Sequence, residues 1–257
     1  MKINQVAAQL YTLRDFIKTP ADIAASMKKV REIGYTSVQV SGMGPIDEAE
    51  LMKILDGEGL TCCATHEPSD VIRGTPEVAV ERLKKLNCKY TAYPYPVGID
   101  FSNPEHVSSL IADLDKAGAV FREAGQVLGY HNHAIEFLRV DGKTLLETIY
   151  DSTAPENLVG EIDTYWVQYG GGDPVAWCER LAGRLPLLHL KDYGYLPENK
   201  PVFAEIGYGN LDFKRIVAAA EKSGCEWYII EQDTCPGDPF ESLKMSFDYI
   251  AENLIEA

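Results

Sequence analysis

Long apolar segments are missing from this 257-residue sequence, and no cleavable leader is expected. No run of apolar residues reaches the length needed to cross a bilayer, and the N-terminus lacks the basic and then apolar layout of a signal peptide. The six cysteines show no C-x-x-C spacing, and a chain of this size does not depend on disulfide bonds. We therefore expect a cytoplasmic protein that keeps its thiols reduced.

Positive charge is scarce as well. The sequence has 24 Lys and Arg residues against 39 Asp and Glu residues, which gives a formal net charge of -15. It contains no cluster of basic residues, so it is expected to repel the phosphates of nucleic acids and the surfaces of anionic membranes. We therefore expect neither a nucleic acid nor a membrane as a partner.

Short apolar segments, suited to strands, alternate with longer amphipathic segments that suit helices. The expected strands are 3–10, 35–41, 61–66, 90–93, 126–129, 158–163, 187–191 and 227–231. The expected helices are 19–33, 46–58, 75–86, 103–125, 144–150, one that opens at 173, 211–224 and 240–256. Eight strand and helix units without a linker predict a single-domain (β/α)8 TIM barrel over residues 1–257.

Histidine and acidic residues gather where the expected strands end. They are His66, Glu67, His131, His133, Glu161, Asp163, His189, Glu231 and Asp233, and Lys191 lies among them. Active sites of barrels lie at this end, and the oxygen and nitrogen atoms of Asp163, His189 and Glu231 suit one divalent metal ion, Mn²⁺, Mg²⁺, Co²⁺ or Zn²⁺. We expect a fourth ligand from the segment 130–136. The alternative is that each residue simply pairs with its neighbour on the next strand.

Five segments give the sequence a resemblance to a known family. They are Gln-Leu-Tyr-Thr-Leu-Arg at 9–14, Tyr-His-Asn-His-Ala-Ile-Glu-Phe at 130–137, His-Leu-Lys-Asp at 189–192, Gly-Tyr-Gly-Asn-Leu-Asp-Phe at 207–213 and Tyr-Ile-Ile-Glu-Gln-Asp at 228–233. Together they resemble the xylose isomerase-like barrel superfamily of sugar and sugar-phosphate isomerases and epimerases. The resemblance covers nearly the whole chain and implies a small-molecule sugar as the substrate.

The resemblance also implies a metal site. In that family the metal is held by Glu, Asp, His and Glu from strands five to eight, and the last three correspond to Asp163, His189 and Glu231. The position of the first Glu falls at His131, whereas Glu136 follows in the next loop. The fourth ligand is therefore His131, which we favour, or Glu136.

The departure at the fourth ligand affects the expected reaction. In the epimerases of this family the first and last glutamates resemble a pair of bases on opposite sides of the substrate carbon, next to a carbonyl that the metal polarises. Glu231 corresponds to one base, and His133 or Glu136 would be the other. The resemblance thus implies an isomerase or epimerase with an enediolate intermediate. Relatives with the same His-x-His strand are similar to dehydratases and keto-glycoside lyases, so elimination from a keto sugar or an inosose is the alternative.

Further residues are expected to contact the substrate. His66 ends the third strand and is expected to bind a substrate hydroxyl, or else to be a buried structural histidine. Lys191 is expected to bind a carbonyl or phosphate oxygen, or to pair with Asp163 or Asp192. Tyr11 belongs to a group of aromatic residues in loops after strands, where a ring can stack on a sugar.

The segment 207–209, Gly-Tyr-Gly, is expected to form a turn before the next helix, with a close approach to a phosphate as the alternative. Gln39 stands where relatives often have Glu. The relatives are often dimers or tetramers, so the resemblance implies a homo-oligomer. Two rivals remain. A nuclease of the same fold is disfavoured by the acidic charge, and a catalytically silent sugar-binding barrel is kept open by the irregular fourth ligand.

Overall fold

The computed structural model describes residues 1–255, and its centre is a closed barrel of eight parallel strands. In barrel order the strands are β1, β12, β9, β8, β5, β4, β3 and β2. Their bounds are β1 Val6–Gln9, β2 Ser37–Val40, β3 Thr61–His66, β4 Tyr90–Tyr93, β5 Val127–His131, β8 Val159–Asp163, β9 Leu187–Leu190 and β12 Trp227–Ile230. The prediction of a (β/α)8 barrel is confirmed, including its short fourth strand.

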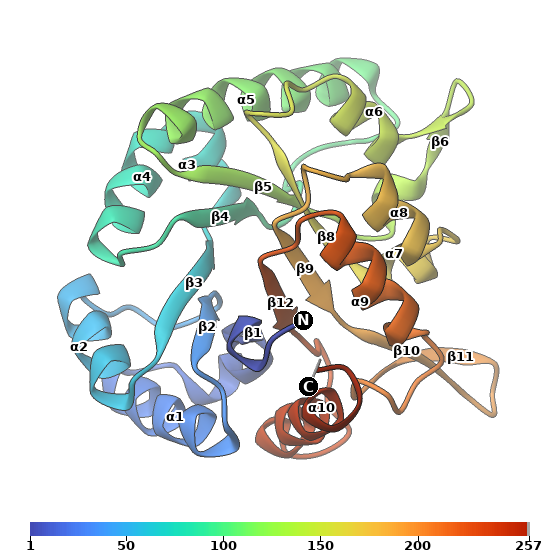
Figure 1. The fold of residues 1–257 in the computed structure, drawn as a ribbon. Helices are drawn as coiled ribbons and strands as arrows, with labels where there is room; N and C mark the ends of the chain where they lie inside the picture. Colours follow the sequence, from blue (N-terminus) through green and yellow to red (C-terminus); the bar gives the residue numbers. More distant parts are fainter. Residues whose placement is uncertain (256–257) are drawn as a thin grey trace.

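Helices surround the barrel on all sides (Figure 1). They are α1 Pro20–Ile33, α2 Glu48–Glu58, α3 Ser69–Gly74, α4 Pro76–Lys85, α5 Pro104–Glu123, α6 Leu145–Asp151, α7 Thr164–Tyr169, α8 Pro174–Arg180, α9 Phe213–Lys222 and α10 Pro239–Asn253. The last helix was expected to reach Glu256, which lies outside the described residues. Within residues 1–255, no helix combines the length and apolar character that a membrane span requires.

Local sequence signals explain where α1 begins and ends. The Thr19 side chain accepts a hydrogen bond from the backbone N–H of Asp22, and Pro20 occupies the first helical position, where no N–H is needed. The helix stops at Gly34, whose φ of 127° is open to glycine but strained for other residues. These are the signals from which the helix was predicted.

The interior of the barrel is divided into an apolar layer and a polar layer. Ala7, Cys63, Ala64, Tyr90, Leu187 and Ile229 form a small apolar cluster of their own. Side chains two residues apart on a strand share a face, so His189 and Glu231 lie on the same face as Leu187 and Ile229, one step nearer the carboxyl ends. The apolar layer therefore supports a polar layer at the mouth.

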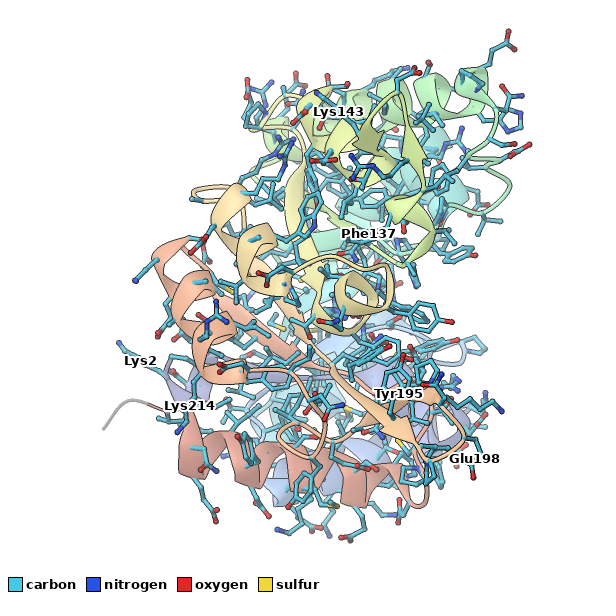
Figure 2. The ribbon with its side chains drawn as sticks, turned by 90° about the vertical axis from the view of Figure 1, so that its right-hand side faces the viewer. Lys2, Phe137, Lys143, Tyr195, Glu198 and Lys214 are labelled. Carbon is cyan, nitrogen blue, oxygen red and sulfur yellow. The ribbon has the colours of Figure 1, made fainter. Side chains whose placement is uncertain are left out.

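Two short antiparallel ribbons extend the mouth. The larger ribbon pairs β10 (Asp192–Leu196) with β11 (Lys200–Ala204). A smaller ribbon pairs β6 (Arg139–Val140) with β7 (Lys143–Thr144). Figure 2 shows Tyr195 and Glu198, on the first ribbon, at the side of the molecule opposite to Lys2. Neither ribbon pairs with the barrel sheet.

Two 3-10 helices flank the first strand. The prediction of a strand over 3–10 was too long, because η1 covers Ile3–Gln5 and η2 covers Leu10–Phe16. A third, η3 (Ile135–Phe137), follows the fifth barrel strand. Both η2 and η3 begin within five residues of the carboxyl end of a strand, so they shape the rim of the mouth.

Candidate metal centre

Four side chains that were expected to bind a metal meet at the mouth. His131, Asp163, His189 and Glu231 are all buried, and one potential ligand atom from each lies within 4.8 Å of every other. Strand register explains the meeting, since Asp163 on β8 pairs with His189 on β9 in the parallel ladder. The Nδ1 atom of His189 lies 3.0 Å from Glu231 Oε2 and 3.9 Å from Asp163 Oδ2. We call these four residues the outer cluster.

The donor atoms of the outer cluster fit a divalent cation. Two imidazoles and two carboxylates form a set that Zn²⁺, Mn²⁺ or Co²⁺ binds readily. The Oδ2 atom of Asp163 is buried and has no hydrogen-bond partner, although His131 Nε2 lies 3.9 Å from it. A buried carboxylate oxygen without a hydrogen bond is costly unless a cation compensates it.

The Lys191 ammonium supplies part of this compensation. Its Nζ lies 2.9 Å from Asp163 Oδ2 and 2.7 Å from Glu231 Oε2, whereas its hydrogen bond goes to Asp233 Oδ2 at 3.1 Å. Burial disfavours the charged amine, but these three carboxylates outweigh burial and raise the pKa of Lys191. Lys191 is therefore a charged neighbour of the outer cluster.

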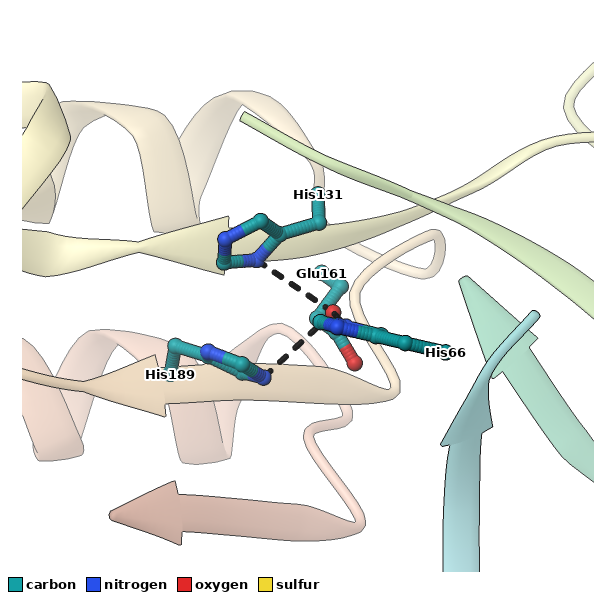
Figure 3. A group of neighbouring side chains, drawn as sticks. All are labelled: His66, His131, Glu161 and His189. Atoms are coloured by element: carbon teal, nitrogen blue, oxygen red, sulfur yellow. Dashed lines mark hydrogen bonds and ion pairs between the residues drawn. The ribbon is translucent and has the colours of Figure 1, made fainter. Parts of the chain in front are cut away.

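A second group lies deeper in the barrel, around the carboxylate of Glu161. Figure 3 shows His66, His131 and His189 converging on this side chain. Glu161 Oε2 lies 2.5 Å from His66 Nε2, 3.3 Å from His131 Nδ1 and 3.4 Å from His189 Nε2. Its other oxygen accepts a hydrogen bond from Gln39 Nε2 at 2.6 Å. We call Glu161, Gln39 and His66 the inner network.

The inner network fixes the orientation of the His189 ring. An ionised carboxylate can only accept hydrogen bonds, so the amide nitrogen of Gln39 must face Glu161. The amide oxygen of Gln39 then faces His189 Nε2, at 2.7 Å, and this nitrogen must carry a proton. The Nδ1 atom of His189 is left to face the outer cluster, which is the arrangement common among metal-binding histidines.

Charge in the two groups is distributed unevenly. Burial, assisted by His189, lowers the pKa of His131 to about 3, so this imidazole is neutral, as a metal ligand must be. Burial also opposes the charged form of His189, but Glu161 and Glu231 outweigh it and raise its pKa to about 10. Burial raises the pKa of Glu161 as well, but His189 and His66 outweigh it and hold that pKa well below the usual range.

The two residues considered as a second base lie in different places. His133 lines the mouth, and burial lowers the pKa of its imidazole to about 2. Glu136 is fully buried, and its carboxylate accepts hydrogen bonds from Tyr130 Oη at 2.9 Å and from the backbone N–H of His133 at 2.8 Å. Burial raises the pKa of Glu136 to about 7. Its carboxylate therefore faces the protein interior and lies outside the outer cluster.

A cavity of about 510 Å³ opens above the outer cluster. It is lined by Tyr11, Arg14, Ser41, His66, Pro94, Tyr95, His131, His133, Trp166, Phe203, Glu231, Asp233 and Thr234. Two of the three residues expected to contact substrate, Tyr11 and His66, belong to this lining. The third, Lys191, is buried directly beneath it.

Sequence reasoning did not find the central position of Glu161. It was noted only as a strand-end residue, although it lies two residues before Asp163 and so shares its face of β8. Asn132 was also passed over, and its side-chain oxygen accepts the backbone N–H of Asp163 at 3.0 Å. The alternation of side chains along β8 was the signal that could have identified Glu161.

These features define a class, namely a TIM barrel with a polar, cation-compatible site at the carboxyl ends of its strands. Residues 27–252 match the family model of the xylose isomerase-like TIM barrel, and the chain therefore belongs to that family. The resemblance inferred from the sequence is confirmed.

Similar proteins carry names from two reaction classes. The chain is 31% identical, over 264 aligned residues, to an inosose dehydratase of Geobacillus kaustophilus, with 87% of this chain and 85% of that protein covered. It shares its fold with a sugar phosphate isomerase/epimerase from Parabacteroides distasonis, at a TM-score of 0.82, 22% identity and coverage of 98% and 95%. It also shares its fold with an L-ribulose 3-epimerase, at a TM-score of 0.73, 14% identity and coverage of 99% and 95%. The family and its relatives identify the chain as an enzyme.

Proposed function

We propose that this enzyme binds one divalent metal ion at the outer cluster and removes a proton from the carbon next to the carbonyl of a keto sugar or keto cyclitol. The observation that carries the proposal is the outer cluster itself, with its oriented His189 ring and with an Asp163 oxygen that makes no hydrogen bond and is paired with Lys191. When bound, the ion would polarise the carbonyl and stabilise the negative charge that develops after proton removal. The fourth ligand in this proposal is His131, and Glu136 is structural.

Glu231 is the base in this proposal. Its carboxylate lines the cavity, and burial opposes its ionisation. Lys191, together with His189 in the metal-free protein, outweighs burial and holds the pKa of Glu231 well below the usual range. An ionised carboxylate at the cavity wall can accept a proton from a substrate held within hydrogen-bond reach. The ammonium of Lys191 then lies beside the acid form and favours its return to the carboxylate.

Among the outcomes of this first step, we favour loss of water over epimerisation. The acidic residues of the lining, Glu231 and Asp233, both follow β12, whereas the lining from β3 and β5 supplies the imidazoles of His66, His131 and His133. In an elimination, Glu231 takes the proton from carbon and gives it to the hydroxyl that leaves the next carbon, so water departs and the carboxylate is restored. Epimerisation requires a second group that returns a proton to the opposite face. The similarity to an inosose dehydratase supports the same choice.

Epimerisation is the second candidate, because His133, two residues after the end of β5, lines the cavity and could return a proton. The ring centroids of His131 and His133 are 4.9 Å apart, so His133 lies beside His131, the proposed fourth ligand. In this alternative His133 acts on the face of the substrate opposite to Glu231.

The two reactions are separated by incubating the metal-loaded protein with a keto-inositol and with a panel of ketoses in deuterated water. Elimination yields a dehydrated product that absorbs in the ultraviolet, whereas epimerisation yields a deuterated epimer without that absorbance. Glu231→Gln should abolish both signals, and Glu123→Gln, an exposed site at the end of α5, should change neither. Absence of both products and of deuterium incorporation across the panel would refute the proposed function.

A further inference from the structure

We infer that the mouth of this barrel takes an uncharged polyhydroxy ketone and discriminates against its phosphate ester. This inference rests on the proposed function and names the substrate class of the same site. In barrels of this architecture, phosphate is commonly bound by backbone N–H groups in the loops after strands seven and eight. Here those N–H groups are already used by carboxylates of the chain.

The loop after the seventh strand is organised around Asp192. Its Oδ2 accepts the N–H groups of Gly207 and Gly209, both at 2.9 Å, and its Oδ1 accepts those of Tyr193 at 2.7 Å and Leu211 at 3.2 Å. The side chain is fully buried, and a Cβ on Gly209 would lie 2.4 Å from Asp192 Oδ1. This is the geometry of an anion-binding turn, and its anion is a side chain of the protein itself.

At the N-termini of the helices around the mouth, backbone N–H groups likewise donate to Asp carboxylates of the chain. After the eighth strand, the Asp238 carboxylate accepts the N–H of Phe240 at the beginning of α10. Asp212 does the same for Arg215 in α9, and Asp163 for Trp166 in α7. Each of these carboxylates opposes the approach of a second anion to the same helix start.

The positively charged side chains near the cavity already contact oxygen atoms of the protein. Lys191 contacts three carboxylates, as described above. Arg14 is the one Lys or Arg side chain among the described residues that line the cavity. Its guanidinium donates to the backbone oxygens of Tyr11 and Asp233 and lies 4.5 Å from the centre of the Tyr11 ring. A phosphate entering the mouth would instead meet the carboxylates of Glu231 and Asp233.

The remaining lining suits a neutral sugar. Tyr11, Tyr95, Trp166 and Phe203 offer aromatic surfaces, and the histidines offer ring nitrogens for hydroxyl groups. Aromatic rings beside side chains that form hydrogen bonds suit the carbon face and the hydroxyl groups of an uncharged sugar. Charge, backbone donors and aromatic surface therefore all favour the same substrate class.

The test compares D-ribulose and D-fructose with their terminal phosphate esters. Binding to the metal-loaded protein is measured by titration calorimetry, and deuterium incorporation is measured in parallel. We expect each ester to bind on the order of a hundredfold more weakly than the parent ketose, since the proposed metal ion is held by the outer cluster and no uncommitted side-chain cation among the described lining residues compensates the phosphate. Inorganic phosphate should not compete with the ketose. An ester that binds more tightly than its parent, or a failure of both to bind, would overturn the inference.

Two variants locate the cause of the discrimination. Asp233→Asn removes one charge from the lining and should reduce the preference for the ketose by roughly tenfold, whereas Glu123→Gln, remote from the mouth, should leave it unchanged. Asp192→Ala empties the anion-binding turn, so inorganic phosphate should raise the melting temperature of this variant and not that of the wild type. Equal ratios in wild type and Asp233→Asn would contradict the electrostatic explanation.

The two proposals fail in different ways. If ketoses bind better than their esters but no deuterium is incorporated, the inference stands and the proposed function falls. If deuterium enters the substrate and the esters are preferred, the proposed function stands and the inference falls.

Discussion

The inner network and the outer cluster both combine carboxylates with histidines. They differ in how many of their carboxylate oxygens form hydrogen bonds within the protein. Around Glu161 both carboxylate oxygens meet donors, from Gln39 and His66, so the carboxylate is paired within the protein. In the outer cluster Asp163 Oδ2 has no hydrogen bond within residues 1–255, and Lys191 and His189 balance the negative charge. We infer from this difference that the inner carboxylate stabilises the fold and that the outer carboxylates serve a ligand.

The strongest test of this comparison is to remove the inner carboxylate. Glu161→Ala should lower the free energy of unfolding by about 3 to 5 kcal/mol, because it removes the buried carboxylate that pairs with Gln39 and His66 and offsets the charge of His189. Urea unfolding of the metal-free protein measures the loss, with Glu123→Ala on the surface as the control. A loss no larger than that of the control would mean that the inner network is not structural.

Glu136 is a third buried carboxylate, and its pKa shows how strongly burial disfavours the ionised form when no cation compensates it. Its pKa is raised from 4.5 to about 7, so the folded state binds the proton more tightly than the unfolded state does. The stability that this difference contributes is present below pH 4.5 and is lost as the pH rises to 7. Glu136→Gln does not ionise, so its stability relative to wild type should increase by about 3 kcal/mol over this range. A pH-independent difference, in unfolding curves measured at each pH, would contradict the raised pKa.

The outer cluster is tested by adding metal. A divalent ion at about one hundred times its dissociation constant should stabilise the wild type by about 2.7 kcal/mol, because it binds only the folded state. Asp163→Asn should lose most of this gain, while Asp56→Asn on the surface of α2 should retain it. Thermal unfolding with Mn²⁺, Co²⁺ or Zn²⁺ against chelator provides the measurement. A wild type that none of these ions stabilises would refute the metal site.

The smallest effect is expected from changing Gln39, which connects the inner network to His189 of the outer cluster. Gln39→Leu removes the acceptor of the His189 Nε2 proton without touching a proposed ligand, and such changes typically weaken metal binding by about 10-fold to 100-fold. Competition with a coloured chelator measures the affinity, and Gln5→Leu at the other end of the barrel serves as the control. Unchanged affinity in Gln39→Leu would show that the inner network does not orient the ligand.

The barrel was predictable because its signals are local. Caps such as Thr19 and stops such as Gly34 mark helices within a few residues, and strand ends mark the mouth. The inner network was not predictable, because Gln39, His66 and Glu161 come from β2, β3 and β8 and meet only when the barrel closes. The sequence placed Lys191 at a strand end, but its three carboxylate contacts depend on side-chain conformations that spacing does not specify.

One carboxylate connects the proposed ligand site to a helix. Asp163 Oδ1 accepts the N–H of Trp166 at 2.9 Å and so begins α7, while Oδ2 faces the outer cluster. Trp166 also lines the cavity. The Asp163 side chain would therefore couple ion binding to the mobility of the first turn of α7. The amide hydrogen of Trp166 becomes a reporter, whose exchange with solvent should slow when the cation arrives and stiffen one wall of the substrate cavity.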